Sequence, residues 1–183
     1  MVAYPRIIIA DERRAGIVAP SVMLAAALKH MGWPIRLFHV GVNESDIRLL
    51  KLATGCEVTL LDPFLLVSTR LLKTLFETAA SPDCINILIA PLGSRQGDDP
   101  PIVSPCAAEM ARTLECPMVP ILFADSSAII AARALENVLQ QIQVAGANPC
   151  VGVLFASVLN PREYQLLETE AGRRSPLLCL GYL

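Results

Sequence analysis

The residues with the most chemical meaning lie between a predicted strand, residues 7–10, and a helix predicted to begin at Pro20. A strand, a loop and a helix in this order are the frame of a phosphate-binding loop with the pattern G-x-x-x-x-G-K-[ST]. In that loop, backbone N–H groups and the lysine hold phosphates, and the hydroxyl holds Mg²⁺. The chain keeps Gly16, but Ile17 replaces the lysine and Val18 replaces the hydroxyl. The frame is therefore kept, while the groups that bind phosphate and metal are missing.

Two carboxylates make the same loop less suited to a nucleotide. Asp11 stands where the first glycine of the pattern belongs, and Glu12 follows it. Their charges would repel a triphosphate, and Asp11 lacks the backbone freedom of glycine. We therefore expect ATP to bind weakly or not at all, no cofactor to be used, and Gly16, Ile17 and Val18 to form an inactive phosphate loop.

Apolar runs that alternate with helical segments are expected to position this loop. Strands are expected at 6–10, 35–40, 58–61, 85–90, 118–123, 151–157 and 177–180. Helices are expected at 20–31, 46–54, 66–80, 105–114, 126–145 and 161–172. The strand runs are continuously apolar, which is typical of parallel strands covered on both faces. The pattern predicts one α/β domain over residues 1–183, with a mainly parallel central sheet and helices on both faces.

Composition excludes several classes of protein. The net charge is −2 and the pI is near 5.7, so there is no basic surface for a nucleic acid. No apolar run approaches the ~18 residues of a membrane span, and the amino terminus lacks a signal-peptide pattern. The six cysteines form no C-x-x-C pair and the chain has two histidines, so we expect reduced cysteines and no metal site. The expectation is a cytoplasmic protein without a membrane segment.

The order of several short segments resembles the amino-terminal synthetase domain of cobyrinic acid a,c-diamide synthase. Segment 38–46 (FHVGVNESD) is similar to the family's F-K-x-G-P-D-Y-I-D-P, and 61–66 (LDPFLL) is similar to its N-L-D-P-W-M. Further similar segments are 53–55 (ATG), 104–111 (SPCAAEMA), 116–122 (CPMVPIL), 151–158 (VGVLFASV) and 178–183 (LCLGYL). The resemblance implies a P-loop NTPase-like, dethiobiotin-synthetase-like three-layer fold and descent from an ATP- and Mg²⁺-dependent amidoligase. The glutamine amidotransferase domain of that family is expected to be absent.

Departures from the family pattern affect three parts of its phosphoryl-transfer site. The phosphate loop lacks its lysine and hydroxyl, and His39 and Asn43 replace the lysine and the aspartate of the second motif. The acidic residue after the central strand is also missing, because Ala90-Pro91-Leu92 stands there. Losing all three parts is hard to reconcile with ordinary ATP-driven catalysis, so no residue is assigned a catalytic role.

Six residues are interpreted as remnants of the substrate cleft: Arg13, Arg14, His39, Asn43, Asp46 and Asp62. Four of them also have a purely structural explanation. Asp62 would cap a turn, Arg13 and Arg14 would form a solvated turn balanced by the preceding carboxylates, and His39 would be a half-buried structural histidine. The pair Asp98-Asp99 is read as part of a solvated loop. Cys106, at a predicted helix start, has no evident base to make it a nucleophile.

Three functions remain open from the sequence. The first is a non-catalytic homologue that acts as a binding or assembly subunit, as a homodimer or with a partner protein. The second is an amidoligase-type enzyme of corrinoid biosynthesis with unorthodox binding of ATP and Mg²⁺. The third is a small-molecule module, for a corrinoid-type ligand, that uses the old cleft. The loop-like segment 92–104, rich in glycine and proline, is expected to form an association surface with the other strand ends.

Overall fold

The computed structural model describes residues 4–14, 17–66, 68–94, 99, 101–125, 127–144 and 149–183. The strands are β1 (Arg6–Arg13), β2 (Ile35–Val40), β3 (Val58–Leu61), β4 (Ile85–Ser94), β5 (Ile102–Val103), β6 (Met118–Phe123), β7 (Val153–Ala156) and β8 (Cys179–Tyr182). The helices are α1 (Pro20–His30), α2 (Glu44–Thr54), α3 (Thr69–Ala79), α4 (Pro105–Leu114), α5 (Ala128–Val144) and α6 (Pro161–Arg174). Every element expected from the sequence is present, and the main differences are at the element ends.

The sheet is parallel apart from one short strand. Its order is β3-β2-β4-β1-β6-β7-β8, and β5 pairs antiparallel with β4. The strand that begins the chain therefore lies in the interior of the sheet, between β4 and β6. Because the other strands of this order run parallel to β1, their carboxyl ends meet at one edge, where the connecting loops converge.

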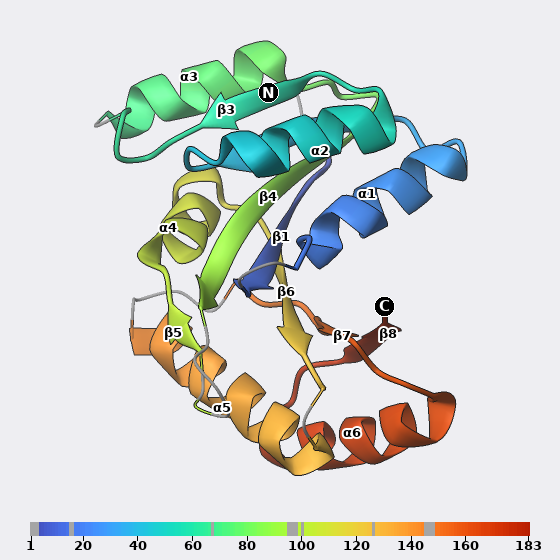
Figure 1. Ribbon diagram of the computed structural model, residues 1–183. Helices are drawn as coiled ribbons and strands as arrows, with labels where there is room; N and C mark the ends of the chain where they lie inside the picture. Colours follow the sequence, from blue (N-terminus) through green and yellow to red (C-terminus); the bar gives the residue numbers. More distant parts are fainter. Residues whose placement is uncertain are drawn as a thin grey trace.

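Helices cover both faces of the sheet, as Figure 1 shows. Buried residues of α1 and α2 pack with one set of strand residues, and those of α3, α4, α5 and α6 pack with the alternate set. In β1, for example, Ile8 and Ala10 face the four-helix side, while Ile9 faces α1 and α2. Burial on both faces explains why the strands are apolar at successive positions, and it confirms the expected three-layer architecture.

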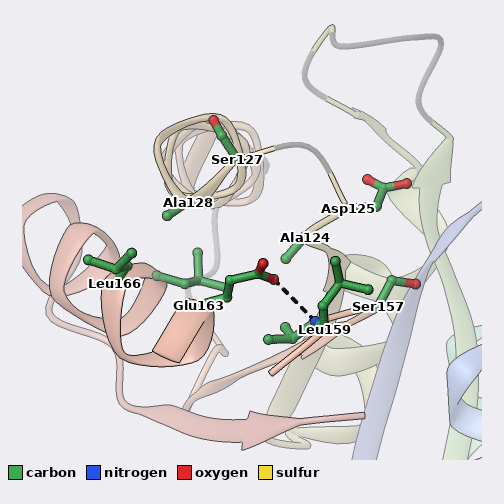
Figure 2. Close-up of a pocket in the computed structure, with 10 residues that line it drawn as sticks. Ala124, Asp125, Ser127, Ala128, Ser157, Leu159, Glu163 and Leu166 are labelled. Atoms are coloured by element: carbon green, nitrogen blue, oxygen red, sulfur yellow. Dashed lines mark hydrogen bonds between the residues drawn. The ribbon is translucent and has the colours of Figure 1, made fainter. Parts of the chain in front are cut away.

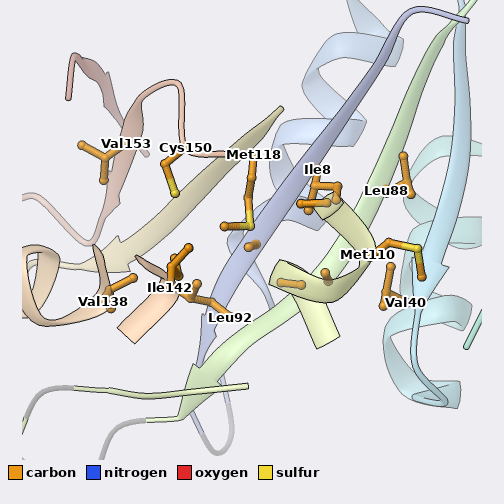
Figure 3. Close-up of a cluster of buried hydrophobic side chains, with 14 of the residues drawn as sticks. Ile8, Val40, Leu88, Leu92, Met110, Met118, Val138, Ile142, Cys150 and Val153 are labelled. Carbon is orange, nitrogen blue, oxygen red and sulfur yellow. The ribbon is translucent and has the colours of Figure 1, made fainter. Parts of the chain in front are cut away.

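The larger core lies between the sheet and α4 and α5. Ile8 of β1, Met118 of β6, Met110 of α4 and Val138 of α5 belong to one buried cluster there (Figure 3). Polar residues define where the helices begin. Asn43, Ser68, Ser104 and Asn160 each accept a hydrogen bond from a backbone N–H in the first turn of α2, α3, α4 and α6. This rigid scaffold fixes the strand ends that carry the site.

Two sequence expectations need correction. β1 does not end at residue 10 but runs to Arg13, because its last residues pair with β4 through an irregularity at Asp11 and Glu12. Segment 92–104 is not a plain loop. β4 continues to Ser94, and β5 returns beside it, held by the Gln141 side chain, which bonds the Val103 N–H and the Pro101 carbonyl, both at 3.0 Å. Residues 95–98, with Asp98, and residue 100 lie outside the described residues, whereas Asp99 is exposed.

In the part of the chain that the structure describes, no helix has the length and apolar character needed to cross a bilayer.

The close pairing of β4 and β5 can be tested by substitution at Gly93. A Cβ added at Gly93 would lie 2.0 Å from the Ile102 carbonyl oxygen of β5, so Gly93→Ala requires the two backbones to separate. We expect Gly93→Ala to lower the free energy of unfolding by about 1–3 kcal/mol in urea denaturation. Gly172→Ala is the matched control, because that site in α6 is open, and there alanine should stabilise by about 0.5–1 kcal/mol. Equal effects at the two glycines would contradict the observed hairpin.

Candidate functional site

Five of the residues interpreted as cleft remnants come together at the carboxyl ends of β1, β2 and β4. They line one cavity of about 480 Å³, which is walled by Arg13, Arg14, Ile17, His39, Val40, Gly41, Val42, Asn43, Asp46, Pro91 and Ser94. Asp62 and Val18 do not line it, and Gly16 is outside the described residues. We call this space the strand-end cavity. Its residues come from segments as far apart as β1 and β4, which the parallel sheet brings to one edge.

Asp11 is buried at the end of β1 and binds the start of α1. One carboxylate oxygen accepts the Ser21 backbone N–H at 3.0 Å, and the other accepts the Ser21 hydroxyl. Ser21 is the second residue of α1, so a carboxylate of the chain itself occupies the amino end of this helix. Burial raises the pKa of Asp11 from 3.8 to about 6, although the bonds from Ser21 and the nearby Arg13 partly oppose the rise. The helix terminus that a phosphate would occupy in a phosphate-binding loop is satisfied by Asp11.

Glu12 and Arg14 connect the end of β1 to β6. A Glu12 carboxylate oxygen accepts the Phe123 N–H at 3.0 Å, and the other accepts from Arg14 Nε at 3.3 Å. Arg14 also pairs with Asp125, and its guanidinium lies 4.5 Å from the centre of the Phe123 ring. The expected charge balance by a preceding carboxylate is present at Glu12, but Arg14 is not in a solvated turn. Its charge is committed to two carboxylates and an aromatic ring, because β1 extends far enough to carry it beside β6.

Arg13 connects β1 to α2. Its guanidinium pairs with Asp46 in the first turn of that helix. The Asn43 side chain caps α2 by accepting the Asp46 N–H at 3.3 Å, and it donates to the Asp46 carboxylate at 2.9 Å. The solvated-turn expectation is therefore wrong for Arg13 as well. Both partners are only partly exposed, so this ion pair is better shielded from water than a surface pair.

His39 lies at the end of β2 and is fully buried rather than half-buried. Its Nδ1 is 2.8 Å from the Gly41 carbonyl oxygen, and its Nε2 is 3.6 Å from Asp46, beyond hydrogen-bonding distance. Among the described residues, Nε2 has no hydrogen-bond partner. Burial lowers the pKa of His39 below its usual 6.5, and the Gly41 bond and Asp46 oppose this only in part. The lowered pKa favours the neutral form of the ring, and His39 is one of the residues that line the strand-end cavity.

Asp62 and the cysteines have structural surroundings. The Asp62 carboxylate accepts the N–H groups of Phe64 and Leu65 at 2.7 and 3.3 Å, which is the turn-capping role given as its structural explanation. The six cysteines all lie within the described ranges and form no disulfide. Burial raises the pKa of Cys116 and of Cys150 to about 12, so these thiols are unreactive at neutral pH. Cys106 is buried at the start of α4.

A second cavity, of about 340 Å³, lies beyond the ends of β6 and β7 (Figure 2). Asp125, Ser127, Ser157 and Glu163 supply its polar groups, and leucines of α6 and the preceding loop supply apolar walls. The Glu163 carboxylate accepts the Leu159 N–H at 3.3 Å, and Ser157 has a positive φ of 63°. This cavity was not predicted from the sequence. The one available signal was that Asp125 follows the predicted strand 118–123, as other site residues follow theirs.

Within the described ranges, no three histidine, cysteine, aspartate or glutamate side chains gather as a metal-binding group.

Comparison with known proteins confirms the resemblance and the fold. No family model matches the chain. Over 152 residues it is 29% identical to cobyrinate a,c-diamide synthase of Syntrophotalea carbinolica, which covers 80% of this chain and 33% of that protein. The chain thus spans about a third of the length of this curated relative.

Solved structures of the P-loop NTPase type share the architecture. Chloroplast FtsY of Physcomitrella patens superposes with a TM-score of 0.61 at 12% identity, over 97% of this chain and 57% of that one. FlhF in complex with GTP and Mg²⁺ gives 0.55 at 11% identity, over 98% and 65%. FtsY of Elizabethkingia anophelis in complex with GDP gives 0.56 at 10% identity, over 97% and 56%. At these identities the likeness shows the fold alone.

The raised pKa of Asp11 predicts that the stability of the fold depends on pH. Because its pKa is raised in the folded protein, protonated Asp11 contributes to the free energy of unfolding. This contribution is fully present below pH 3.8 and is lost as the pH rises through about 6. Asp11→Asn keeps the shape and can bond both Ser21 groups without a charge. We expect the variant to gain stability relative to the wild type between about pH 4 and pH 7, by up to roughly 3 kcal/mol.

Urea denaturation at each pH measures this difference. Asp99→Asn, at an exposed carboxylate, is the control and should follow the wild type at every pH. A difference between Asp11→Asn and the wild type that stays flat with pH would show that Asp11 does not titrate as its burial requires.

Proposed function

We propose that this chain is a P-loop-fold domain, related to cobyrinate a,c-diamide synthase, that serves as a binding or assembly subunit and not as an ATP-dependent amidoligase. The observation that carries the proposal is the bond between the buried Asp11 carboxylate and the amino end of α1. A phosphate bound at that helix end would have to displace Asp11 from Ser21. It would also meet a negative charge 3.0 Å from the N–H group that it needs.

Other groups at the site support the same conclusion. Ile17 and Val18, which take the positions of the lysine and the hydroxyl, are apolar and about half exposed. The two arginines nearby are engaged, Arg13 with Asp46 and Arg14 with Glu12 and Asp125. A triphosphate would therefore gain no free cation from these side chains without breaking an ion pair, which costs stability when the partner carboxylate is buried.

The alternative is an amidoligase-type enzyme that binds ATP in an unorthodox way. The cavity at the ends of β6 and β7 favours this reading, because its apolar walls and the Asp125 and Glu163 carboxylates offer a place for a heterocycle with N–H donors. A nucleotide held there would be recognised through its base, with little contribution from its phosphates.

Thermal melting with ATP and Mg²⁺ separates the two functions. We expect no shift in Tm at millimolar ATP, because Asp11 and the paired arginines disfavour the phosphates. A ligand at ~100 times its Kd would add about 2.7 kcal/mol, which such a measurement detects easily. A saturable shift with ATP would overturn the binding-subunit proposal. A shift with adenosine alone would support base recognition in the second cavity. The variant Ile17→Lys should stay unresponsive, because Asp11 still occupies the helix end.

An assembly role predicts an association surface at the strand ends. Phe64 and Ile102 are 66% and 77% exposed, and Val42 and Leu65 beside the neighbouring strand ends are similarly exposed. We expect the chain to form a homodimer through these apolar residues and expect Phe64→Ser with Ile102→Ser to weaken it at least several-fold, since burial of each such side chain contributes about 1.5–3 kcal/mol. Sedimentation equilibrium measures the dissociation constant.

The matched control for association is Met31→Ser. Met31 is 73% exposed but follows α1 and precedes β2, so it belongs to the opposite edge of the sheet. It should leave the dissociation constant unchanged. A wild-type chain that sediments as a monomer, or a control that weakens the dimer as much as the double variant, would refute this surface.

A further inference from the structure

The cavity beyond the ends of β6 and β7, of about 340 Å³, is formed by two segments that the sheet holds in place. The Ala124 N–H, after β6, donates to the Ala156 carbonyl at 2.9 Å. The Ser157 N–H, after β7, donates to the main-chain oxygen of Leu183 at 3.1 Å. The walls are therefore fixed by the fold, as they are in most small-molecule sites. We call this space the β6–β7 cavity.

The polar side chains of the β6–β7 cavity are acceptor-rich and include no cation. Asp125 and Glu163 supply carboxylates, and Ser127 and Ser157 supply hydroxyls. None of the described residues that line the cavity is a lysine, an arginine or a histidine. The charge of Asp125 is balanced from outside the cavity by Arg14. The remaining negative charge of the lining is that of Glu163.

Glu163 has a carboxylate oxygen that a ligand can reach. One oxygen accepts the Leu159 N–H at 3.3 Å, while the second has no hydrogen bond or ion pair among the described residues. In Figure 2 the Glu163 side chain extends from α6 toward Leu159 and Ala124, among the residues that line the cavity. The residue is exposed, so its second oxygen is open to a donor that enters the cavity.

The amino end of α6 does not make this cavity an anion site. A helix start attracts anions through N–H groups that have no partner. Here Pro161, at the first helical position, has no N–H, and the Glu163 N–H donates to the Asn160 side chain at 3.0 Å. A ligand carboxylate or phosphate would meet the carboxylates of Asp125 and Glu163, and it would gain no cation from the lining. The charge of the cavity favours a cationic donor.

The apolar walls indicate what the rest of such a ligand is. Leu159 and Leu166 are 83% and 57% exposed, and Leu167 is buried behind them in α6. A bare ammonium ion would leave the exposed leucines in water, whereas an apolar body would cover them. A neutral ligand would cover Glu163 as well, and it would take water from that carboxylate without supplying a charge in return.

We propose that the β6–β7 cavity binds a small primary amine, whose ammonium donates to the second oxygen of Glu163 and whose apolar body packs on Leu159 and Leu166. This ligand class deepens the proposed binding role and rests on it. Binding in this way keeps the Glu163–Leu159 hydrogen bond and the Arg14–Asp125 ion pair, so the fold does not have to rearrange.

Isothermal titration calorimetry with 2-phenylethylamine tests the proposal. We expect saturable binding at one site, because the ammonium pairs with Glu163 and the ring covers the leucines. Three matched probes each lack one feature. They are 2-phenylethanol, which has the body without the charge, methylammonium, which has the charge without the body, and 3-phenylpropionate, which has the opposite charge. Each should bind at least tenfold more weakly than 2-phenylethylamine.

Variants of α6 locate the site. Glu163→Gln keeps an acceptor for the Leu159 N–H and removes the charge, so it should weaken binding of 2-phenylethylamine about tenfold. Leu166→Ala should weaken it several-fold through the lost apolar contact. Glu168→Gln, at an exposed carboxylate of the same helix that does not line the cavity, is the matched control and should leave the Kd unchanged.

Four results would overturn the proposal: no saturable binding of the amine, equal affinity for 2-phenylethanol, an unchanged Kd in Glu163→Gln, or tighter binding of adenosine than of the amine. These results concern the ligand class and are distinct from the melting experiment with ATP and Mg²⁺. A saturable shift with ATP would overturn the binding-subunit proposal whatever the amine does, and failure of the amine to bind would leave that melting result as it stands.

Discussion

The organisation of the site depends on four consecutive charged residues, Asp11 to Arg14, at the end of a central strand. Asp11 binds the start of α1, Glu12 and Arg14 bind β6 and its end, and Arg13 binds α2. A charge buried in the interior of a sheet is costly unless it is paired, so each of these contacts must persist in the folded chain. Neighbouring side chains of a strand point to opposite faces, so one run of residues can reach elements on different sides. The irregular β1–β4 pairing at Asp11 and Glu12 falls within this run.

This arrangement differs physically from an anion-binding site that is empty before its ligand binds. In a phosphate-binding loop the helix amino end and the loop cations are satisfied only when the nucleotide arrives. Here the chain supplies the anion itself, through Asp11, and the arginines are neutralised by Glu12, Asp46 and Asp125. The folded state therefore needs no ligand to balance these charges. Within the described residues, His39 Nε2, which lies 3.6 Å from Asp46, has no hydrogen-bond partner.

Much of the fold could be predicted from the sequence, because it depends on local apolar patterns. Continuous apolar runs predicted parallel strands, and Pro20 and Pro105 predicted two helix starts. The β4–β5 pairing could not be predicted, because two-residue β5 is held by Gln141, far along the chain, and not by a local pattern. Five of the six residues interpreted as cleft remnants line one cavity, because the ends of parallel strands meet at one edge of the sheet. Their partners were not predictable, because Arg13 and Asp46 are 33 residues apart and Arg14 and Asp125 are 111 apart.

The burial of His39 shows why residue types alone were insufficient. From the sequence, a histidine in place of a lysine indicates a lost cation. Its structural explanation was a half-buried histidine without a chemical role. The structure gives it a fixed tautomer, because β2 ends in a glycine turn that returns a carbonyl to Nδ1. The substitution thus replaces a donor with an acceptor at the same strand end, and it does so beside an arginine whose charge is already balanced by Asp46.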